Sequence, residues 1–174
     1  RADLRGAHLQ GARLVMVNLE ECDLRPGVYV KKVSRQNRTD LSNTNMSDAS
    51  LVNAQLDEAN LSRSNLSGTD FSGASMPQVD LTDSDMRAAN MTRTKLKGAV
   101  LAGANLSGAD LTGANLAEAD LTGANFQDAD LSNADLSSAD LSSADLYGAD
   151  LGSSIMVGIN LWSADLRHAD LRDT

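Results

Sequence analysis

With 174 residues the chain is about the size of one domain, and its aromatic content of only 3% argues against a globular core of the usual kind. The formal net charge of −9, from 24 acidic and 15 basic residues, argues against nucleic acid as a direct partner. No apolar run approaches the roughly 20 residues that cross a membrane, the single Cys22 excludes an internal disulfide, and no signal peptide is visible. One cysteine leaves the compartment undetermined, and we favour the cytoplasm.

Residues 1–26 introduce a five-residue pattern that governs almost the whole chain. Large apolar residues stand at positions 4, 9, 14, 19 and 24, and the series resumes at 41 and runs to 171, giving 32 centres: 25 Leu, five Met and two Phe. The residue two before each centre is small, with Ala in 21 cases, and the residue between them is usually Asp or Asn. Two mostly polar residues or glycines follow each centre, as in "ADLTGANLAEADLTGANF".

A period of five requires the chain to turn a corner in every repeat. On an α-helix successive centres would lie about 140° apart, so no apolar stripe would form. On a continuous strand they would alternate between the two faces, because five is an odd number. All centres point inward only if short extended segments are joined by tight corners, which winds the chain into coils stacked about 4.8 Å apart. The small residue and the centre then fill the interior, and the other three positions face solvent.

The A-[D/N]-L-x-x unit resembles the pentapeptide repeat family over nearly the whole chain. The resemblance implies an all-β fold, a right-handed quadrilateral β-helix with four repeats in each coil. The 32 centres then give about eight coils, about 38 Å long at the spacing of stacked strands. Both ends cut through a repeat, so we expect a single domain, 1–174, that is a fragment of a longer chain.

One segment interrupts the pattern between complete units at 22–26 and 39–43. This predicted insertion, residues 27–38, carries four bases and no acid, and Pro26-Gly27 at its start signals a turn. A solenoid tolerates an insertion at a corner, because the neighbouring coils stay paired. We interpret the segment as a candidate contact loop, with a merely tolerated insertion as the alternative; its candidate residues are Val28, Tyr29, Lys31, Lys32, Arg35 and Arg38.

The sequence offers no constellation that predicts catalysis, a cofactor or a metal site. His8 and His168 lie at opposite ends of the predicted rod, and Cys22 occupies an inward small position where a thiol replaces Ala. Residues twenty apart stack, which predicts an acidic column on one side; its members are Asp70, Asn90, Asp110, Asp130, Asp150 and Asp170. Stacked carboxylates attract cations, but Asp and Asn are also the default of this repeat at that position, and we favour the second interpretation.

The C-terminal half is strongly acidic, since no Lys or Arg occurs from 98 to 166. Some pentapeptide repeat proteins are understood to mimic DNA with such an array and to bind DNA gyrase, protecting it from quinolones. The alternative is that the acids keep the rod soluble.

Apolar residues replace polar ones near the C-terminal end, at "SSIMVGINLW". They predict a candidate interaction patch of Tyr147, Ile155, Val157 and Trp162. A homodimer through the C-terminal coils, another protein or a flanking segment could cover it, or it could reflect local strain. The resemblance supports the dimer, because the C-terminal coils of gyrase-binding relatives form one. We therefore expect a non-enzymatic scaffold for contact with an unknown protein partner, and as the alternative a DNA mimic that binds gyrase.

Overall fold

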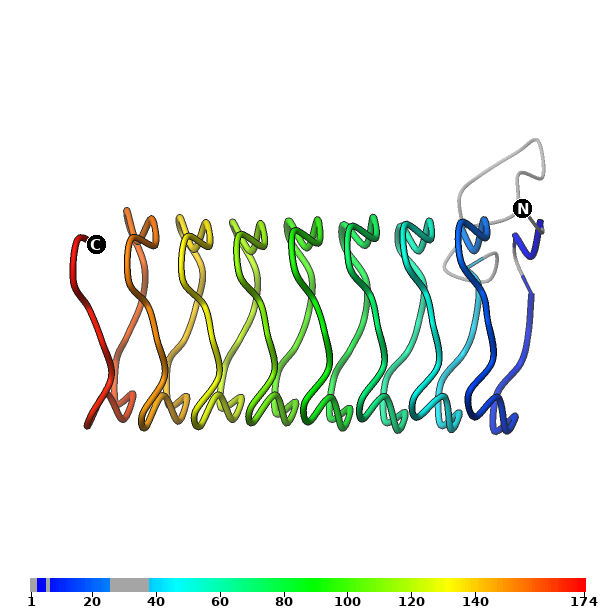
Figure 1. Cartoon of the computed structure of the whole chain (residues 1–174), viewed down its shortest axis with the longest axis horizontal. Helices are drawn as coiled ribbons and strands as arrows, with labels where there is room; N and C mark the ends of the chain where they lie inside the picture. Colours follow the sequence, from blue (N-terminus) through cyan, green and yellow to red (C-terminus); the bar gives the residue numbers. More distant parts are fainter. Residues whose placement is uncertain (1–2, 6, 26–37) are drawn as a thin grey trace.

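The computed structural model describes residues 3–5, 7–25 and 38–174. Figure 1 shows them wound into coils that stack along one axis, with the two termini at opposite ends of the rod. These described residues contain no helix, and so none that could cross a membrane. They also contain no strand longer than a single bridged residue, because each extended segment is ended by a corner within its own repeat.

The coil length follows from the residues that pair. Parallel bridges join residues 20 apart, as in the series Asp70, Asn90, Asp110, Asp130, Asp150 and Asp170. This spacing equals four five-residue repeats, so each coil has four sides, and the bridged residues form a column along the rod. We name the positions of a repeat from its centre: the small slot lies two residues before it, the outward slot one before it, and the two corner residues follow it.

The repeat around Leu111 shows how the backbone pairs. The Leu111 amide donates to the Asp130 carbonyl of the next coil at 2.7 Å, and the Asp110 amide donates to the Ala89 carbonyl of the preceding coil at 3.0 Å. The amide of the second corner residue, Gly113, donates to the Ser132 carbonyl of the next coil at 2.9 Å. The Ala114 amide donates to the Leu111 carbonyl at 2.9 Å and so closes the turn at the corner. Four of the five amides of the repeat are therefore paired with backbone carbonyls.

The interior is a thin column of centres and small-slot residues. Every centre from Leu24 to Leu151 in the described chain is at most 1% exposed, and the small slots beside them are buried too. Burial decreases toward both ends, where Leu4, Leu9, Leu14 and Leu19 and then Met156, Leu161 and Leu166 are only partly covered. The inward direction of the apolar residues agrees with the five-residue arithmetic.

The corners place a residue in the left-handed backbone region. Every described second corner residue has a positive φ, whether or not it is glycine. A positive φ at the third residue of a turn closed between its first and fourth residues is the type II pattern. Glycine adopts this conformation without strain, whereas other residues lose about 1–2 kcal/mol to it. Alanine at such a corner, as at Ala88 with a φ of 53°, is therefore strained.

We expect Ala88→Gly to raise the free energy of unfolding by about 0.5–1 kcal/mol, since it removes the left-handed strain at a smaller cost in chain entropy. The opposite change, Gly123→Ala, should lower it by a similar amount, because a Cβ at Gly123 would meet no atom within 4 Å and so tests the backbone alone. Urea denaturation monitored by circular dichroism would measure both. Effects of the same sign for the two variants would contradict this explanation of the corners.

The pairing distance changes once along the chain. Four successive bridges, His8 with Asp40, Arg13 with Asn45, Asn18 with Ser50 and Asp23 with Gln55, join residues 32 apart. This exceeds the usual spacing of 20 by 12, and all four columns resume afterwards with the ordinary spacing. The chain between residues 26 and 37 lies outside the described residues.

Candidate functional site

The outward slot completes the pairing of the backbone. The fifth amide of each repeat, that of the first corner residue, has no backbone carbonyl in the scheme seen around Leu111. Where the outward slot holds Asp or Asn, the side-chain Oδ1 accepts a bond from this amide, as Asp130 does from Ser132 at 2.8 Å. Every Asp and Asn in a described outward slot accepts this bond. The preference for Asp or Asn therefore has a structural cause, the pairing of the first corner amide.

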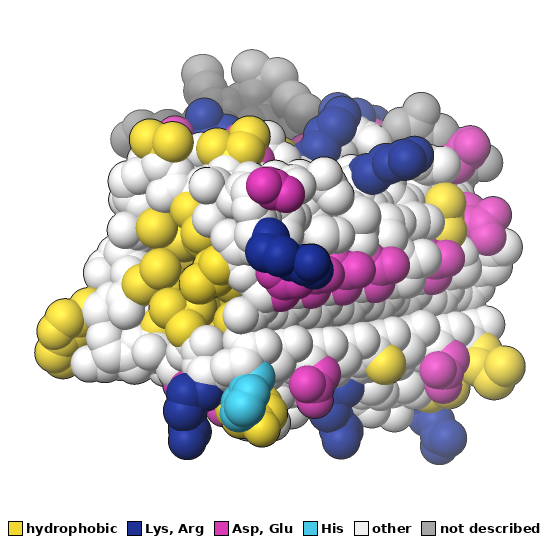
Figure 2. Space-filling model, turned by 60° about the vertical axis from the view of Figure 1, so that its left-hand side comes forward, with side chains coloured by type: hydrophobic (Ala, Val, Ile, Leu, Met, Phe, Trp, Pro, Cys, Tyr) yellow, Lys and Arg dark blue, Asp and Glu magenta, His cyan; other side chains and the backbone are white. Residues whose placement is uncertain are grey.

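This bond separates the structural role of the carboxylates from their charge. Asn accepts the same bond as Asp, so a neutral rod would pair its backbone equally well. Between 130 and 150, however, every outward slot holds Asp, and these five residues encircle one full coil; we call Asp130, Asp135, Asp140, Asp145 and Asp150 the aspartate ring. Figure 2 shows acidic side chains in a row along one side of the rod. The negative charge of the aspartate ring exceeds what the pairing of the backbone requires.

Hydrogen bonds favour the ionised form of two members of the aspartate ring, Asp135 and Asp140. Hydrogen bonds from the Ser137 side chain and amide lower the pKa of Asp135 below its ordinary value. The Ser142 amide and then its side chain do the same for the pKa of Asp140. These two acids therefore present charge, not protonated acid, to a partner. Within the part of the chain that the structure describes, no group of three or more His, Cys, Asp or Glu residues is arranged to hold a metal ion.

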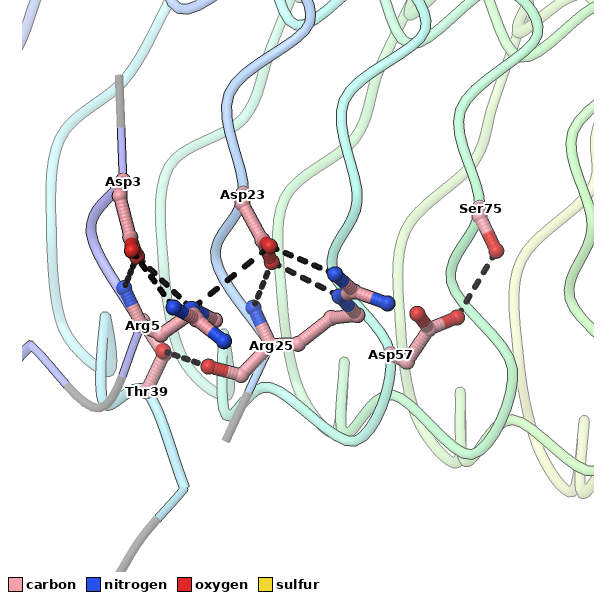
Figure 3. Close-up of polar contacts among 7 residues, drawn as sticks. All are labelled: Asp3, Arg5, Asp23, Arg25, Thr39, Asp57 and Ser75. Atoms are coloured by element: carbon pink, nitrogen blue, oxygen red, sulfur yellow. Dashed lines mark hydrogen bonds and ion pairs between the residues drawn. The ribbon is translucent and has the colours of Figure 1, made fainter. Parts of the chain in front are cut away.

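Arginines fold back onto the acids wherever the sequence reads Asp, centre, Arg. The Arg25 guanidinium contacts both carboxylate oxygens of Asp23, at 2.8 and 2.6 Å, and Arg87 and Arg167 pair with Asp85 and Asp165 in the same way. Figure 3 shows that two such pairs, Asp3 with Arg5 and Asp23 with Arg25, lie side by side in successive coils. Arg5 also lies 3.7 Å from Asp23, so the first coils are connected by a ladder of ion pairs.

The ladder predicts acid sensitivity at the N-terminal end. The Arg25 side chain lowers the pKa of Asp23, which is 9% exposed, and the Arg5 side chain lowers the pKa of Asp3 to about 2. A carboxyl whose pKa is lower in the folded state stabilises the fold above its unfolded pKa, which is about 4 for Asp, and this contribution is lost as the pH falls through the folded value. We expect the free energy of unfolding to fall below pH of about 4, and less steeply in Asp23→Asn. Denaturant titrations across acidic pH would measure it, and identical slopes for the two proteins would contradict the role of Asp23.

A depression of about 850 Å³ lies near the N-terminal end, and its lining includes His8, Arg38, Asp40, Asn60 and Asp80. His8 bridges Asp40, because the pairing distance in this part of the chain is 32 residues. Asp40 is already occupied: it accepts bonds from the Ser42 amide at 3.0 Å and from the Gln10 side chain at 2.6 Å. Asp40 is therefore not a free partner for His8. Cys22, the other nucleophile considered, is buried in its small slot.

The predicted interaction residues at the C-terminal end are exposed, but they do not all lie together. Ile155, Val157 and Trp162 are 52%, 73% and 74% exposed. Ile155 lies on one side of the last coil, Val157 at the corner that ends this side, and Trp162 at the next corner; we call these three the outward patch. Tyr147 precedes Val157 by two repeats, half a coil, which places it at the opposite corner. There its ring packs edge-on against His168 at 5.0 Å and under Arg167 at 5.9 Å.

The candidate contact loop falls largely on residues that are not described. Val28, Tyr29, Lys31, Lys32 and Arg35 lie outside the described residues. Arg38 is described, and its guanidinium lies 4.0 Å from Glu58 of the following coil.

Three comparisons place the chain among known proteins. The family model described as pentapeptide repeats matches it in eight copies, over residues 1–25, 37–63, 64–103, 104–142, 114–152 and 144–174. Among curated proteins no sequence matches. Among solved structures, HetL, a pentapeptide repeat protein involved in heterocyst differentiation regulation from the cyanobacterium Nostoc sp. strain PCC 7120, is 28% identical with a TM-score of 0.64; the match covers 98% of this chain and 87% of HetL.

Two further solved structures are similar in sequence pattern but superpose less well. A pentapeptide repeat protein of the Arabidopsis thaliana thylakoid lumen is 41% identical, with a TM-score of 0.31, over 63% of this chain and 69% of that one. A trypsin-treated form of QnrB1, a plasmid-mediated fluoroquinolone resistance protein, is 19% identical, with a TM-score of 0.43, over 94% of this chain and 90% of QnrB1.

Proposed function

Because the chain belongs to the pentapeptide repeat family, whose members form right-handed quadrilateral β-helices, we propose that it is a non-enzymatic scaffold that binds a protein partner along its side. The observation that carries this proposal is the aspartate ring, in which Asp stands at every slot where Asn would serve the backbone equally well. We infer that this charge, which the fold does not require, serves contact with a partner at the surface. The regulatory involvement of HetL fits a protein of this family that acts through contact.

The proposal includes an architecture and a compartment. We infer about eight coils from 32 centres at four to a coil, and an insertion at residues 27–38 from the bridged pairs that are 32 instead of 20 apart. The inserted segment holds the four bases Lys31, Lys32, Arg35 and Arg38, and we propose that it serves as a basic contact loop. We place the protein in the cytoplasm.

The scaffold proposal is tested by removing charge without removing the backbone bonds. A variant with all five ring residues replaced by Asn should fold like the wild type, because Asn accepts the same bond from the corner amide. Both proteins would be immobilised, and the proteins that each retains would be identified by mass spectrometry. We expect a partner that the wild type retains and the Asn variant does not. The same retained proteins on both would contradict a role for the ring.

The alternative function is DNA mimicry toward DNA gyrase, and the acidic columns favour it. Carboxylates repeat along the column from Asp110 through Asp130 and Asp150 to Asp170 at the spacing of the coils, about 4.8 Å, as phosphates repeat along a duplex. A supercoiling assay tests it directly: a mimic at micromolar concentration inhibits gyrase in a salt-sensitive manner, and the five-Asn variant inhibits less. No effect of the wild type on supercoiling would eliminate this alternative.

A further inference from the structure

The outward patch breaks the polarity rule of the rod at adjacent positions. Ile155 occupies an outward slot, where it accepts no bond from its corner amide, and Val157 and Trp162 are first corner residues. Their exposures are 52%, 73% and 74%; all three point outward, and they belong to the last coil, whose inward residues such as Leu171 are exposed as well. Hydrophobic side chains also gather on the end of the rod that comes forward in Figure 2.

The aspartate ring lies directly beneath the patch. Ile155 bridges Asp135 of the preceding coil, and Asn160, between the two corners, bridges Asp140 and donates to its carboxylate at 3.0 Å. The Ser138 amide donates to the Val157 carbonyl at 2.8 Å and the Ser143 amide to that of Trp162 at 2.8 Å, so the whole patch is stacked on the ring coil. Residues 98–166 contain no Lys or Arg, and the two bases of the last coil, Arg167 and Arg172, are ion-paired with Asp165 and Asp170. The patch is therefore an apolar surface stacked on acids that have no base in residues 98–166.

The charge of the aspartate ring disfavours a second copy of the chain on the outward patch and favours a cationic partner. A second copy placed patch to patch would bring two aspartate rings together, and residues 101–174 carry 12 acids against two bases in each copy. Like charges that face each other across an interface cost several kcal/mol and suppress association. A partner with apolar side chains bordered by Lys or Arg instead covers the patch and pairs with the ring, which is the apolar centre and polar rim of a stable interface.

We propose that the outward patch and the aspartate ring form one docking surface for a cationic protein segment that presents an aromatic or aliphatic anchor between Lys or Arg residues. The proposal rests on the proposed scaffold function and specifies the chemistry of the partner. Trp162 is the principal anchor on this side, because a large exposed aromatic ring contributes most when a partner desolvates it. The acids of the ring set the sign of the partner's charge.

The variant that isolates the patch is Val157→Ser with Trp162→Ser. Both side chains are about three-quarters exposed, so the double variant should keep the fold, and the net charge of −9 is unchanged. Met16→Ser is the matched control: Met16 is also an exposed apolar corner residue, 77% exposed, in the first coils. Melting curves of the three proteins establish that any difference in binding is not a difference in folding.

The experiment selects peptides from a random phage-displayed library on the wild-type chain and measures them by fluorescence anisotropy. We expect the enriched peptides to carry an aromatic or aliphatic residue flanked by Lys or Arg, to bind the wild type and Met16→Ser equally, and to bind the double variant at least about tenfold more weakly, as expected for loss of an anchor residue. The five-Asn ring variant should bind them more weakly as well, with a smaller dependence on salt.

Several results would overturn the proposal: no enrichment, enriched peptides without bases, or equal binding to the double variant. A wild-type dimer in sedimentation velocity that Val157→Ser with Trp162→Ser dissociates would assign the patch to a second copy. The proposed scaffold function fails separately, in the comparison of retained partners between the wild type and the five-Asn variant. If that comparison identifies a partner that the double variant still binds, the scaffold stands and the docking surface is wrong.

Discussion

Leu116→Asp is expected to abolish folding of the central coils. Leu116 is 0% exposed and lies in a column of centres that are all buried. An ionised carboxylate there would lie among buried centres and small-slot residues, where the backbone amides are already bonded to neighbouring coils. The cost of burying an unpaired charge is comparable to the total stability of a domain, about 5–15 kcal/mol. Circular dichroism should show loss of the β spectrum and of the cooperative melt.

Leu116→Met is the control for this substitution, since Met already serves as a centre at Met46, Met76, Met86 and Met91, each 0% exposed. It should cost less than about 1.5 kcal/mol, as exchanges that conserve volume usually do. If Leu116→Asp kept the spectrum and melting temperature of the wild type, the inward direction of the centres would be wrong.

Deletion of residues 102–121 is expected to leave a folded rod that is one coil shorter. The deletion removes four complete repeats and joins Leu101 to Thr122, so every column closes in register. In a solenoid each coil contacts only its neighbours, so loss of one coil removes one interface and leaves the others intact. We expect a cooperative melt with a modestly lower midpoint.

Deletion of residues 102–122 removes one residue more and should behave very differently. It takes the first corner residue out of one repeat, so the type II corner cannot close and the next centre is directed away from the interior. We expect loss of cooperativity, measured by differential scanning calorimetry. Equal melting behaviour of the two deletions would mean that the coil does not depend on a corner in each repeat.

The five-residue period was sufficient to predict the inward centres, because no helix or uninterrupted strand can bury residues spaced by five. The same pattern contained a signal that was not used. Asp and Asn share a side-chain carbonyl oxygen two residues before the first corner amide, and that shared atom explains the outward slot, as at Asp130 with Ser132. The Asp–Arg pairs were also readable, since Arg25 stands two residues after Asp23 and folds back onto it.

Other features depend on geometry that a linear pattern does not contain. His8 lies beside Asp40 only because bridged residues are 32 instead of 20 apart at that point, so its partner comes after the irregular segment. The patch predicted from the sequence included Tyr147, but its separation of two repeats from Val157 corresponds to half a coil and places the two at opposite corners. The exposure of Trp162 is a prediction of the pattern, whereas its stacking on the ring coil follows from the register.

The distance between spin labels at Asn45 and Asp145 tests the central claim most directly, namely that residues 20 apart stack in columns along the rod. Both residues belong to one column, through Asn65, Asp85, Asn105 and Asn125, so they are separated by five coils. With Cys22 replaced by Ala and both positions changed to labelled Cys, double electron–electron resonance should give one narrow distribution near about 24 Å, five times the roughly 4.8 Å between stacked strands. A broad distribution, or one centred beyond about 35 Å, would contradict the columns, because five stacked coils cannot span that length.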